Sequence, residues 1–151
     1  MEKIRKYEDA DKEFIYQTKK NAYKKYVWEY FGSWNEEKQR EYFDEYIKIS
    51  AKDTWIIEMD NKSIGFYNGI TMDNGDYIIG NICIIPEYQG RGIGTKILGS
   101  IINEHYDSNI HIQYFKSNPV GDLYKRLGFI PSMETEFYYQ MIKPKENKHI
   151  K

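Results

Sequence analysis

Three glycines at alternate positions, Gly90, Gly92 and Gly94, follow an apolar run that ends at Pro86. A glycine has no Cβ, so the backbone of such a loop can turn tightly and point several N–H groups at one anion. The apolar spacing after the loop predicts a helix, whose positively polarised end would face the same anion. Arg91 adds a charged donor. These residues suit a phosphate or a pyrophosphate.

Two other phosphate-binding loops fit this stretch less well. A P-loop needs Gly-Lys-Ser/Thr, whereas the order here is Gly94-Thr95-Lys96, without a correctly spaced first glycine. A dinucleotide-binding fingerprint needs a third glycine where Thr95 stands, and no early βαβ unit surrounds the loop. A plain strand-to-helix turn without a ligand is the remaining interpretation.

The composition indicates one domain of 151 residues, long enough to bury a core. Charged residues make up 30% of the chain, yet the net charge is −1, so no basic field points to nucleic acid. Aromatic residues reach 17%, with fifteen tyrosines, which combine apolar bulk with a polar end and can line a pocket.

The single cysteine, Cys83, excludes an intramolecular disulfide and cannot anchor a metal site alone, so we expect neither. The first residues lack an apolar signal region, and no apolar run is long enough to span a membrane. We therefore expect a cytoplasmic protein without a membrane partner.

The apolar periodicity predicts alternating helices and strands in an α+β layout. A strand at 2–7 precedes a helix at 14–31, which Gly32 ends, and a capping box at 33–36 starts a second helix. The remaining predicted elements are strands at 54–59, 63–72 and 77–85, a helix at 93–106, a strand at 110–115, a short helix at 119–127 and strands within 129–142. We expect one domain at 1–143 and a polar, flexible tail at 144–151.

Two motifs resemble the GNAT N-acetyltransferase family. The first is Gln89-x-x-Gly92-x-Gly94 after a strand that ends in proline. The second runs from Asn118 to Phe129 and is similar to the family's Asn-x-x-Ala…Leu-Tyr-x-x-x-Gly-Phe. Together with the element order, the resemblance covers nearly the whole chain. It implies the GNAT acyl-CoA N-acyltransferase fold, with α/β/α layers and a mixed central sheet flanked by helices.

The resemblance also implies roles for the matching residues. Backbone groups of the strand before the loop would pair with the pantetheine arm of acetyl-CoA, and the amides of residues 90–95 would hold its pyrophosphate. Asn118 would hydrogen-bond the arm, and the Tyr124 phenol would protonate the departing CoA thiolate. Packing on the sheet is the alternative for Tyr124. The implied cofactor-binding residues are Ile82, Cys83, Ile84, Gln89, Gly90, Arg91, Gly92, Ile93, Gly94, Thr95, Asn118 and Tyr124.

The second motif departs from the family pattern at two places. The spacing from Asn118 to Tyr124 is one residue shorter than usual, and Ser117 stands at the usual asparagine position. Gly121 replaces the usual alanine, which lowers the helix propensity of the segment.

The acceptor side offers several candidates for the base that must deprotonate an amine. Some family members place a glutamate where Gln113 stands, and a glutamine cannot act as a base. Glu29 is the leading candidate, because the end of the first helix often lines the acceptor pocket in the family; a solvated helix glutamate is the alternative. His105 and His111 titrate near neutral pH, and we expect both to be structural.

Other residues suit acceptor binding. Asn81 on the central strand could orient the acceptor or a water molecule, or be structural. Aromatic side chains could surround an amine through cation–π contacts, with core packing as the alternative. The predicted acceptor-side residues are Trp28, Glu29, Trp34, Asn81 and Tyr138.

The sequence therefore predicts an N-acetyltransferase that uses acetyl-CoA as co-substrate and acetylates the primary amine of a small molecule by direct attack on the thioester. A protein or peptide amine is an alternative acceptor. A non-catalytic acyl-CoA-binding module and a nucleotide-binding protein are alternative functions. The expected partners are acetyl-CoA and an amine, without nucleic acid, and a homodimer is a further expectation by analogy with the fold.

Overall fold

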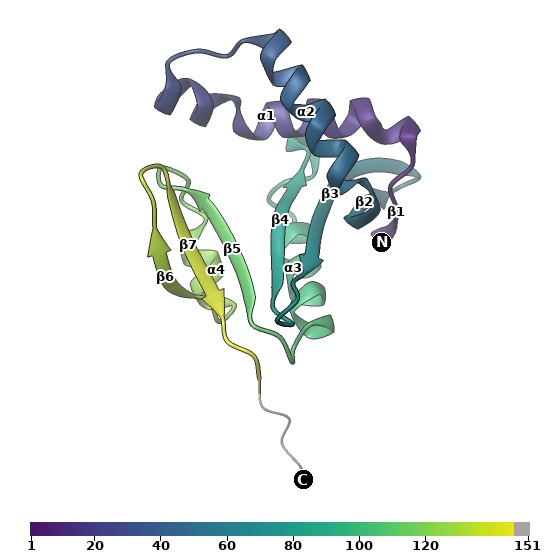
Figure 1. Cartoon of the computed structure of the whole chain (residues 1–151). Coiled ribbons are helices and arrows are strands. Elements are labelled where there is room, and N and C mark those ends of the chain that lie inside the picture. Colours follow the sequence, from purple (N-terminus) through teal and green to yellow (C-terminus); the bar gives the residue numbers. More distant parts are fainter. Residues whose placement is uncertain (147–151) are drawn as a thin grey trace. The chain divides into compact units, whose positions relative to one another are not determined.

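The computed structural model describes residues 1–146, and its strands form a mixed seven-stranded sheet in the order β1-β2-β3-β4-β5-β7-β6 (Figure 1). This arrangement of strands and helices confirms the predicted fold class. The main elements are β1 (Lys3–Lys6), α1 (Lys12–Phe31), α2 (Glu36–Ser50), β2 (Thr54–Met59), β3 (Lys62–Thr71), β4 (Tyr77–Ile84), α3 (Ile93–Glu104), β5 (Ile110–Phe115), α4 (Gly121–Arg126), β6 (Ile130–Glu134) and β7 (Tyr138–Lys143).

The chain divides into two compact units, and β3 and β4 contribute residues to both. Unit 1 comprises Met1–Asn68 and Asn81–Ile93. In it, β1, β2 and β3 pair antiparallel. The buried core of unit 1 joins both helices to β2, β3 and β4, through Ile15, Tyr16, Phe43, Ile47, Ile56, Phe66 and Cys83. The apolar faces of α1 and α2 are therefore the faces that pack on the sheet.

The helix boundaries in unit 1 match the predictions except at the start of α2. Gly32 ends α1 in the left-handed conformation, with a φ of 77°, and its N–H donates to the Trp28 carbonyl, as predicted. The predicted capping box at 33–36 is wrong. Asn35 caps α2, because its side-chain oxygen accepts a hydrogen bond from the Lys38 N–H at 2.9 Å.

Unit 2 comprises Gly69–Gly80 and Gly94–Lys151, of which residues up to 146 are described. A turn at residues 73–76 joins β3 to β4, and the Met72 N–H donates to the Asp76 carbonyl. β4 then pairs in parallel with β5, at Tyr77 with Ile110 and at Ile78 with His111. β7 pairs antiparallel with both β5 and β6.

The predicted tail falls mostly outside the described residues. Its described part is hydrogen-bonded: the Lys145 N–H donates to the Asn109 side-chain oxygen, and the Glu146 N–H donates to the Tyr106 carbonyl, both at 2.8 Å. Residues 147–151 lie beyond the described part of the chain.

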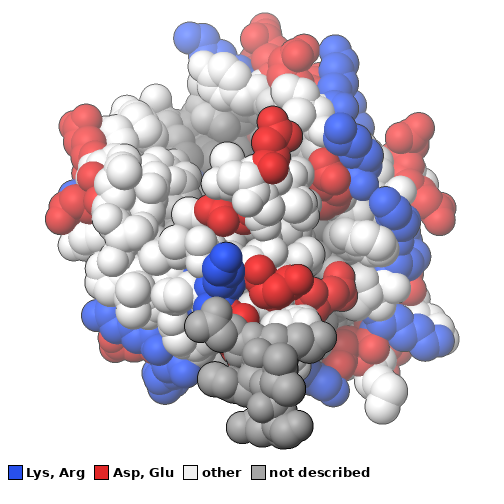
Figure 2. Space-filling view, turned by 60° about the horizontal axis from the view of Figure 1, so that its bottom comes forward, with Lys and Arg blue, Asp and Glu red and all other residues white. Residues whose placement is uncertain are grey.

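The surface mixes charges of both signs. Figure 2 shows Lys and Arg side chains interspersed with Asp and Glu on the face that it draws, in keeping with the net charge of −1. Within residues 1–146, we find no helix with the length and apolar character needed to span a bilayer.

The core of unit 1 predicts a contrast between two isoleucines of α2. Ile47 is 5% exposed and Ile49 is 72% exposed. Ile47→Ala should lower the free energy of unfolding by about 2–5 kcal/mol, because it leaves a cavity in the core. Ile49→Ala should change it by less than about 0.5 kcal/mol. Urea denaturation of both variants measures the difference, and equal effects would contradict this packing.

Candidate active site

The glycine loop that follows β4 has backbone angles that favour glycine at two positions. Gly90 and Gly92 have φ angles of 76° and 78°, in the left-handed region that side chains rarely adopt. A Cβ built on either would meet no heavy atom of another residue within 4 Å. The space beside the loop is thus open. α3 begins at Ile93, so Gly94 and Thr95 lie in its first turn.

Side chains of the loop hold it against its own flanking residues. The Gln89 side-chain amide donates to the Ile84 carbonyl at 2.8 Å, which ties the loop to the end of β4. Arg91 donates one hydrogen bond to the Glu87 carbonyl at 3.1 Å, and its guanidinium lies 4.6 Å from the Tyr88 ring centroid. A guanidinium has five N–H donors, so Arg91 can still contact an anion.

A polar cluster surrounds Asn81, the first residue of unit 1 on β4. The Asn81 side-chain amide donates to the Tyr46 hydroxyl at 3.1 Å and lies 3.4 Å from the Asn68 side-chain oxygen. Asn68 also donates to the Tyr46 hydroxyl. The Lys19 ammonium lies 3.4 Å from the Asn81 side-chain oxygen and 4.1 Å from the Tyr46 ring centroid. Asn81 is thus held by three side chains that the sequence motifs did not single out.

Burial shifts the pKa values of side chains in this cluster. It lowers the pKa of Lys19 and raises that of Tyr46 to about 12. Cys83 is 5% exposed, and burial raises the pKa of its thiol, whose sulfur lies 3.4 Å from the Tyr23 hydroxyl. A buried thiol with a raised pKa is a poor nucleophile, so Cys83 contributes to the packing of the core.

The other predicted acceptor-side residues are spread over both units. Trp28 is 51% exposed on α1, and Glu29 beside it is also exposed. The Trp34 indole N–H donates to the Glu36 carboxylate at 3.1 Å. Tyr138 on β7 stacks on Phe115, with ring centroids 4.6 Å apart. Their roles in acceptor binding stay predictions.

The second motif forms the loop before α4 and α4 itself. The Asn118 side-chain oxygen accepts a hydrogen bond from the Val120 N–H at 3.1 Å and so shapes the turn before α4. Tyr124 is 7% exposed, and its ring centroid lies 5.5 Å from that of Tyr114 and 5.9 Å from that of Phe129. Tyr124 therefore packs against β5, and its acid role stays a prediction.

The structure explains why glycine replaces alanine at position 121. A Cβ there would lie 2.4 Å from the Tyr114 hydroxyl oxygen and 3.0 Å from the adjoining ring carbon. The Tyr114 ring occupies the space that an alanine methyl group would need, so Gly121 and Tyr114 are complementary.

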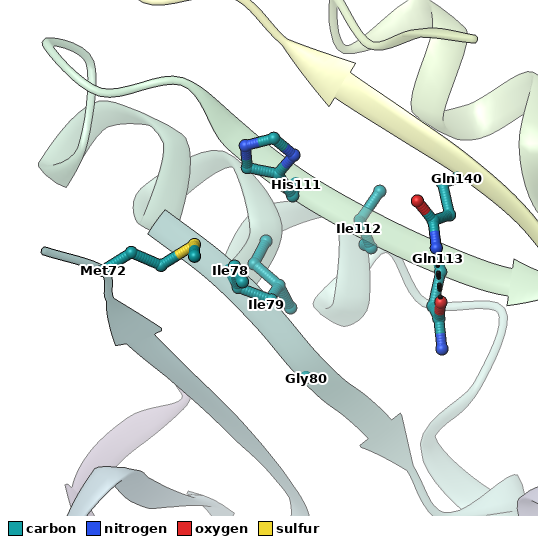
Figure 3. Close-up of a pocket in the computed structure, with 8 residues that line it drawn as sticks. All are labelled: Met72, Ile78, Ile79, Gly80, His111, Ile112, Gln113 and Gln140. Carbon is teal, nitrogen blue, oxygen red and sulfur yellow. Dashed lines mark hydrogen bonds between the residues drawn. The ribbon is translucent and has the colours of Figure 1, made fainter. Parts of the chain in front are cut away.

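A pocket of about 450 Å³ lies in unit 2, where β4 and β5 cease to pair (Figure 3). The register of the two strands ends at Ile78 with His111. Gly80 has no side chain to fill the space beyond. The pocket is lined by Met72, Ile78, Ile79, Gly80, His111, Ile112, Gln113 and Gln140.

Two polar pairs stand at this pocket. The Gln140 side-chain amide donates to the Gln113 side-chain oxygen at 3.3 Å (Figure 3). His111 Nε2 lies 2.8 Å from Asp76 Oδ2, and this hydrogen bond lowers the pKa of Asp76. The sequence did not suggest the pair with Asp76, because its residues are far apart in the chain. A second histidine, His105, stacks on Tyr77 at 3.7 Å between ring centroids.

Comparison with known proteins gives concordant matches. A family model described as an acetyltransferase (GNAT) domain matches residues 50–131, more than half of the chain. An uncharacterised N-acetyltransferase of Pyropia yezoensis, ycf52, is 32% identical over 93 residues, which are 56% of this chain and 53% of that protein. The match to this chain thus spans about half the length of that relative.

Solved structures share the fold along the whole chain. The PaiA N-acetyltransferase of Thermoplasma acidophilum, in complex with coenzyme A, has a TM-score of 0.70 at 20% identity, over 95% of this chain and 99% of its own. The ribosomal-protein-S18-alanine N-acetyltransferase of Escherichia coli has a TM-score of 0.70 at 16% identity, over 100% and 99%. At these identities the likeness concerns the fold.

Burial of Lys19 predicts a pH-dependent effect of Lys19→Met. The folded state disfavours the ammonium, so the cost to stability is complete below the lowered pKa and disappears as pH rises towards about 10.4, where the unfolded chain also loses the proton. The variant should therefore gain most over the wild type near neutral pH and less near about pH 10. Urea denaturation at both pH values measures this, with Lys24→Met on the exposed side of α1 as control. A difference that grows with pH would contradict the assignment.

Proposed function

This chain belongs to the GNAT acetyltransferase family, and on that premise we propose that it transfers an acetyl group from acetyl-CoA to the primary amine of a small molecule. The observation that carries the proposal is the glycine loop. Its two left-handed glycines leave open space beside the backbone directly before a helix begins. Such a loop suits the pyrophosphate of CoA.

The loop supplies the charge complementarity that a pyrophosphate needs. The amides of residues 90–95 converge on the anion, and the first turn of α3 adds its partial positive charge. Arg91 lies in the same loop and keeps donors beyond the one that it gives to Glu87. A side chain at position 90 or 92 would enter the space that the anion needs.

The rest of the cofactor would lie along β4. Backbone groups of Ile82, Cys83 and Ile84 pair with the pantetheine arm as an added strand would. Asn118 uses its side-chain oxygen within its own turn, so its amide N–H groups are the atoms that can donate to the arm. The one-residue shift of Asn118 relative to the family pattern is compatible with this use.

The Tyr124 hydroxyl donates a proton to the departing thiolate. A phenol keeps its proton at neutral pH, so proximity is the main requirement for this task. The T-shaped contact with Tyr114 and the packing on Phe129 hold the ring in place. The amine attacks the thioester carbonyl directly, because the buried Cys83 thiol is unsuited to form an acyl-enzyme.

The pocket in unit 2 supports a small acceptor with an uncharged body. Its lining consists of aliphatic side chains, two glutamines, a glycine and a histidine, with no carboxylate among them. A polyamine would favour acidic groups, so the lining argues against that class. A protein amine is the alternative outcome of an acceptor screen.

The loop predicts a specific response to CoA. Acetyl-CoA and CoA should raise the melting temperature of the wild type, because they bind the native state, whereas ATP and NAD should not. Gly92→Ala should weaken CoA binding by roughly tenfold, because the free loop of the variant leaves the φ of 78°, and its return to that conformation on binding costs an alanine about 1–2 kcal/mol. Gly99→Ala is the matched control, since a Cβ there meets open space without a left-handed backbone.

Thermal shift measurements over a range of CoA concentrations give these affinities. A shift shared with ATP, or no shift with CoA, would contradict the proposed function. Equal CoA binding by both alanine variants would contradict the placement of the pyrophosphate at the loop.

The acid role predicts a kinetic effect of Tyr124→Phe. Loss of the proton donor should lower kcat by roughly a hundredfold, at the low end for general acid catalysis, because a thiolate is a good leaving group. The CoA-induced thermal shift should persist. A screen of small amines and peptides by thiol release provides the assay, and Tyr114→Phe removes a neighbouring phenol as control. Unchanged turnover in Tyr124→Phe would leave the tyrosine with a packing role alone.

A further inference from the structure

We propose that His111, held by Asp76, is the general base that removes the proton from the ammonium group of the acceptor. The inference deepens the proposed function and rests on it, because an acetyl transfer to an amine requires the amine to be neutral. It replaces Glu29 as the candidate base with a residue that lines the pocket.

His111 is the one titratable side chain among the eight residues that line the pocket. Its side chain is 36% exposed, so an acceptor in the pocket can reach it. Figure 3 shows the imidazole on β5, the strand that also carries Ile112 and Gln113. Gln113 lies two residues further along β5 and so on the same face, but its amide cannot take a proton. His111 supplies the basic atom that this face otherwise lacks.

Asp76 fixes which imidazole nitrogen is basic. The carboxylate is ionised, because the hydrogen bond with His111 lowers its pKa, and an ionised carboxylate can only accept. His111 Nε2, 2.8 Å from Asp76 Oδ2, therefore carries the proton. Nδ1 keeps its lone pair and is the atom that accepts a proton, and Asp76 then stabilises the imidazolium.

Among residues 1–146, Asp76 is the charged side chain that hydrogen-bonds the ring. Ile78 of β4 and Ile142 of β7 occupy the register positions on either side of His111. Asp76 is itself oriented by the Asn109 side-chain amide at 3.4 Å and is 19% exposed. These two aliphatic neighbours and one partly buried carboxylate suit an imidazole that becomes an imidazolium only while it holds the proton of the acceptor.

In the proposed reaction, His111 takes a proton from the acceptor, and Tyr124 supplies the proton that the thiolate needs. The acceptor ammonium gives one proton to His111 Nδ1, directly or through one water molecule, and becomes a neutral amine. The amine nitrogen then forms a bond with the acetyl carbonyl carbon, and the bond from that carbon to sulfur breaks. The thiolate takes a proton from Tyr124, and the new amide nitrogen gives up its surplus proton, which restores the phenol. The imidazolium releases its proton to solvent.

The test is the pH profile of kcat/KM with an amine found by the thiol-release screen, between about pH 5 and pH 9. The wild type should lose activity on acidification through one ionisation, because the imidazole takes up a proton. His111→Gln should lower kcat/KM by roughly a hundredfold and abolish that ionisation. Asp76→Asn should lower kcat/KM less and move the ionisation to lower pH, because the imidazolium loses its carboxylate.

His105→Gln is the matched control, since His105 stacks on Tyr77 and is absent from the pocket lining. It should keep the wild-type pH profile. Each variant is first checked for the CoA-induced thermal shift, which separates loss of fold from loss of the base. A wild-type profile in His111→Gln, with turnover intact, would overturn the inference and leave the proposed function standing. A wild type that neither binds CoA nor acetylates an amine would overturn both.

Imidazole ¹⁵N chemical shifts give a readout independent of turnover. At neutral pH the wild type should show His111 protonated on Nε2 and unprotonated on Nδ1. Asp76→Asn should mix the two tautomers. A wild-type His111 protonated on Nδ1 would overturn the inference, because Nδ1 would then have no lone pair to accept the proton of the acceptor.

Discussion

The pairing of β4 with β5 is the interaction on which the candidate site depends. The parallel register extends over two residue pairs, Tyr77 with Ile110 and Ile78 with His111. The residues that follow on each strand line the pocket instead of pairing. If the ladder continued, the strands would stay about 5 Å apart and leave no room for a ligand. Gly80 preserves that room because it has no side chain.

The proposed reaction needs groups that bind the charged cofactor and other groups that transfer protons. A glycine loop with a nearby arginine suits a dianionic pyrophosphate, whereas an almost uncharged pocket suits an amine that must lose its charge. In the proposed mechanism, the Tyr124 phenol is the acid and the His111 imidazole is the base. The carboxylate of Asp76 is kept outside the pocket lining, where it can orient the imidazole without binding the ammonium in its place.

Local features of the sequence predicted the fold well, because each was decided by neighbouring residues. The end of the first helix at Gly32 and the strand at 54–59 are examples. The predicted start of α2 was wrong because Ser33 and Asn35 are both favourable N-cap residues. The choice between them depends on which side chain reaches a free N–H. The pair of His111 with Asp76, and Lys19 beside Asn81, depend on strand register and helix packing, which periodicity alone does not determine.

The most direct test of the central claim is an amide NMR titration of the protein with CoA, and separately with ATP. We expect CoA to shift the amides of residues 90–95 and of Ile82, Cys83 and Ile84, because the former contact the pyrophosphate and the latter pair with the pantetheine arm. ATP should leave the latter three unchanged, since it has no such arm. Shifts with CoA confined to other parts of the chain, or the same response to ATP, would contradict the account.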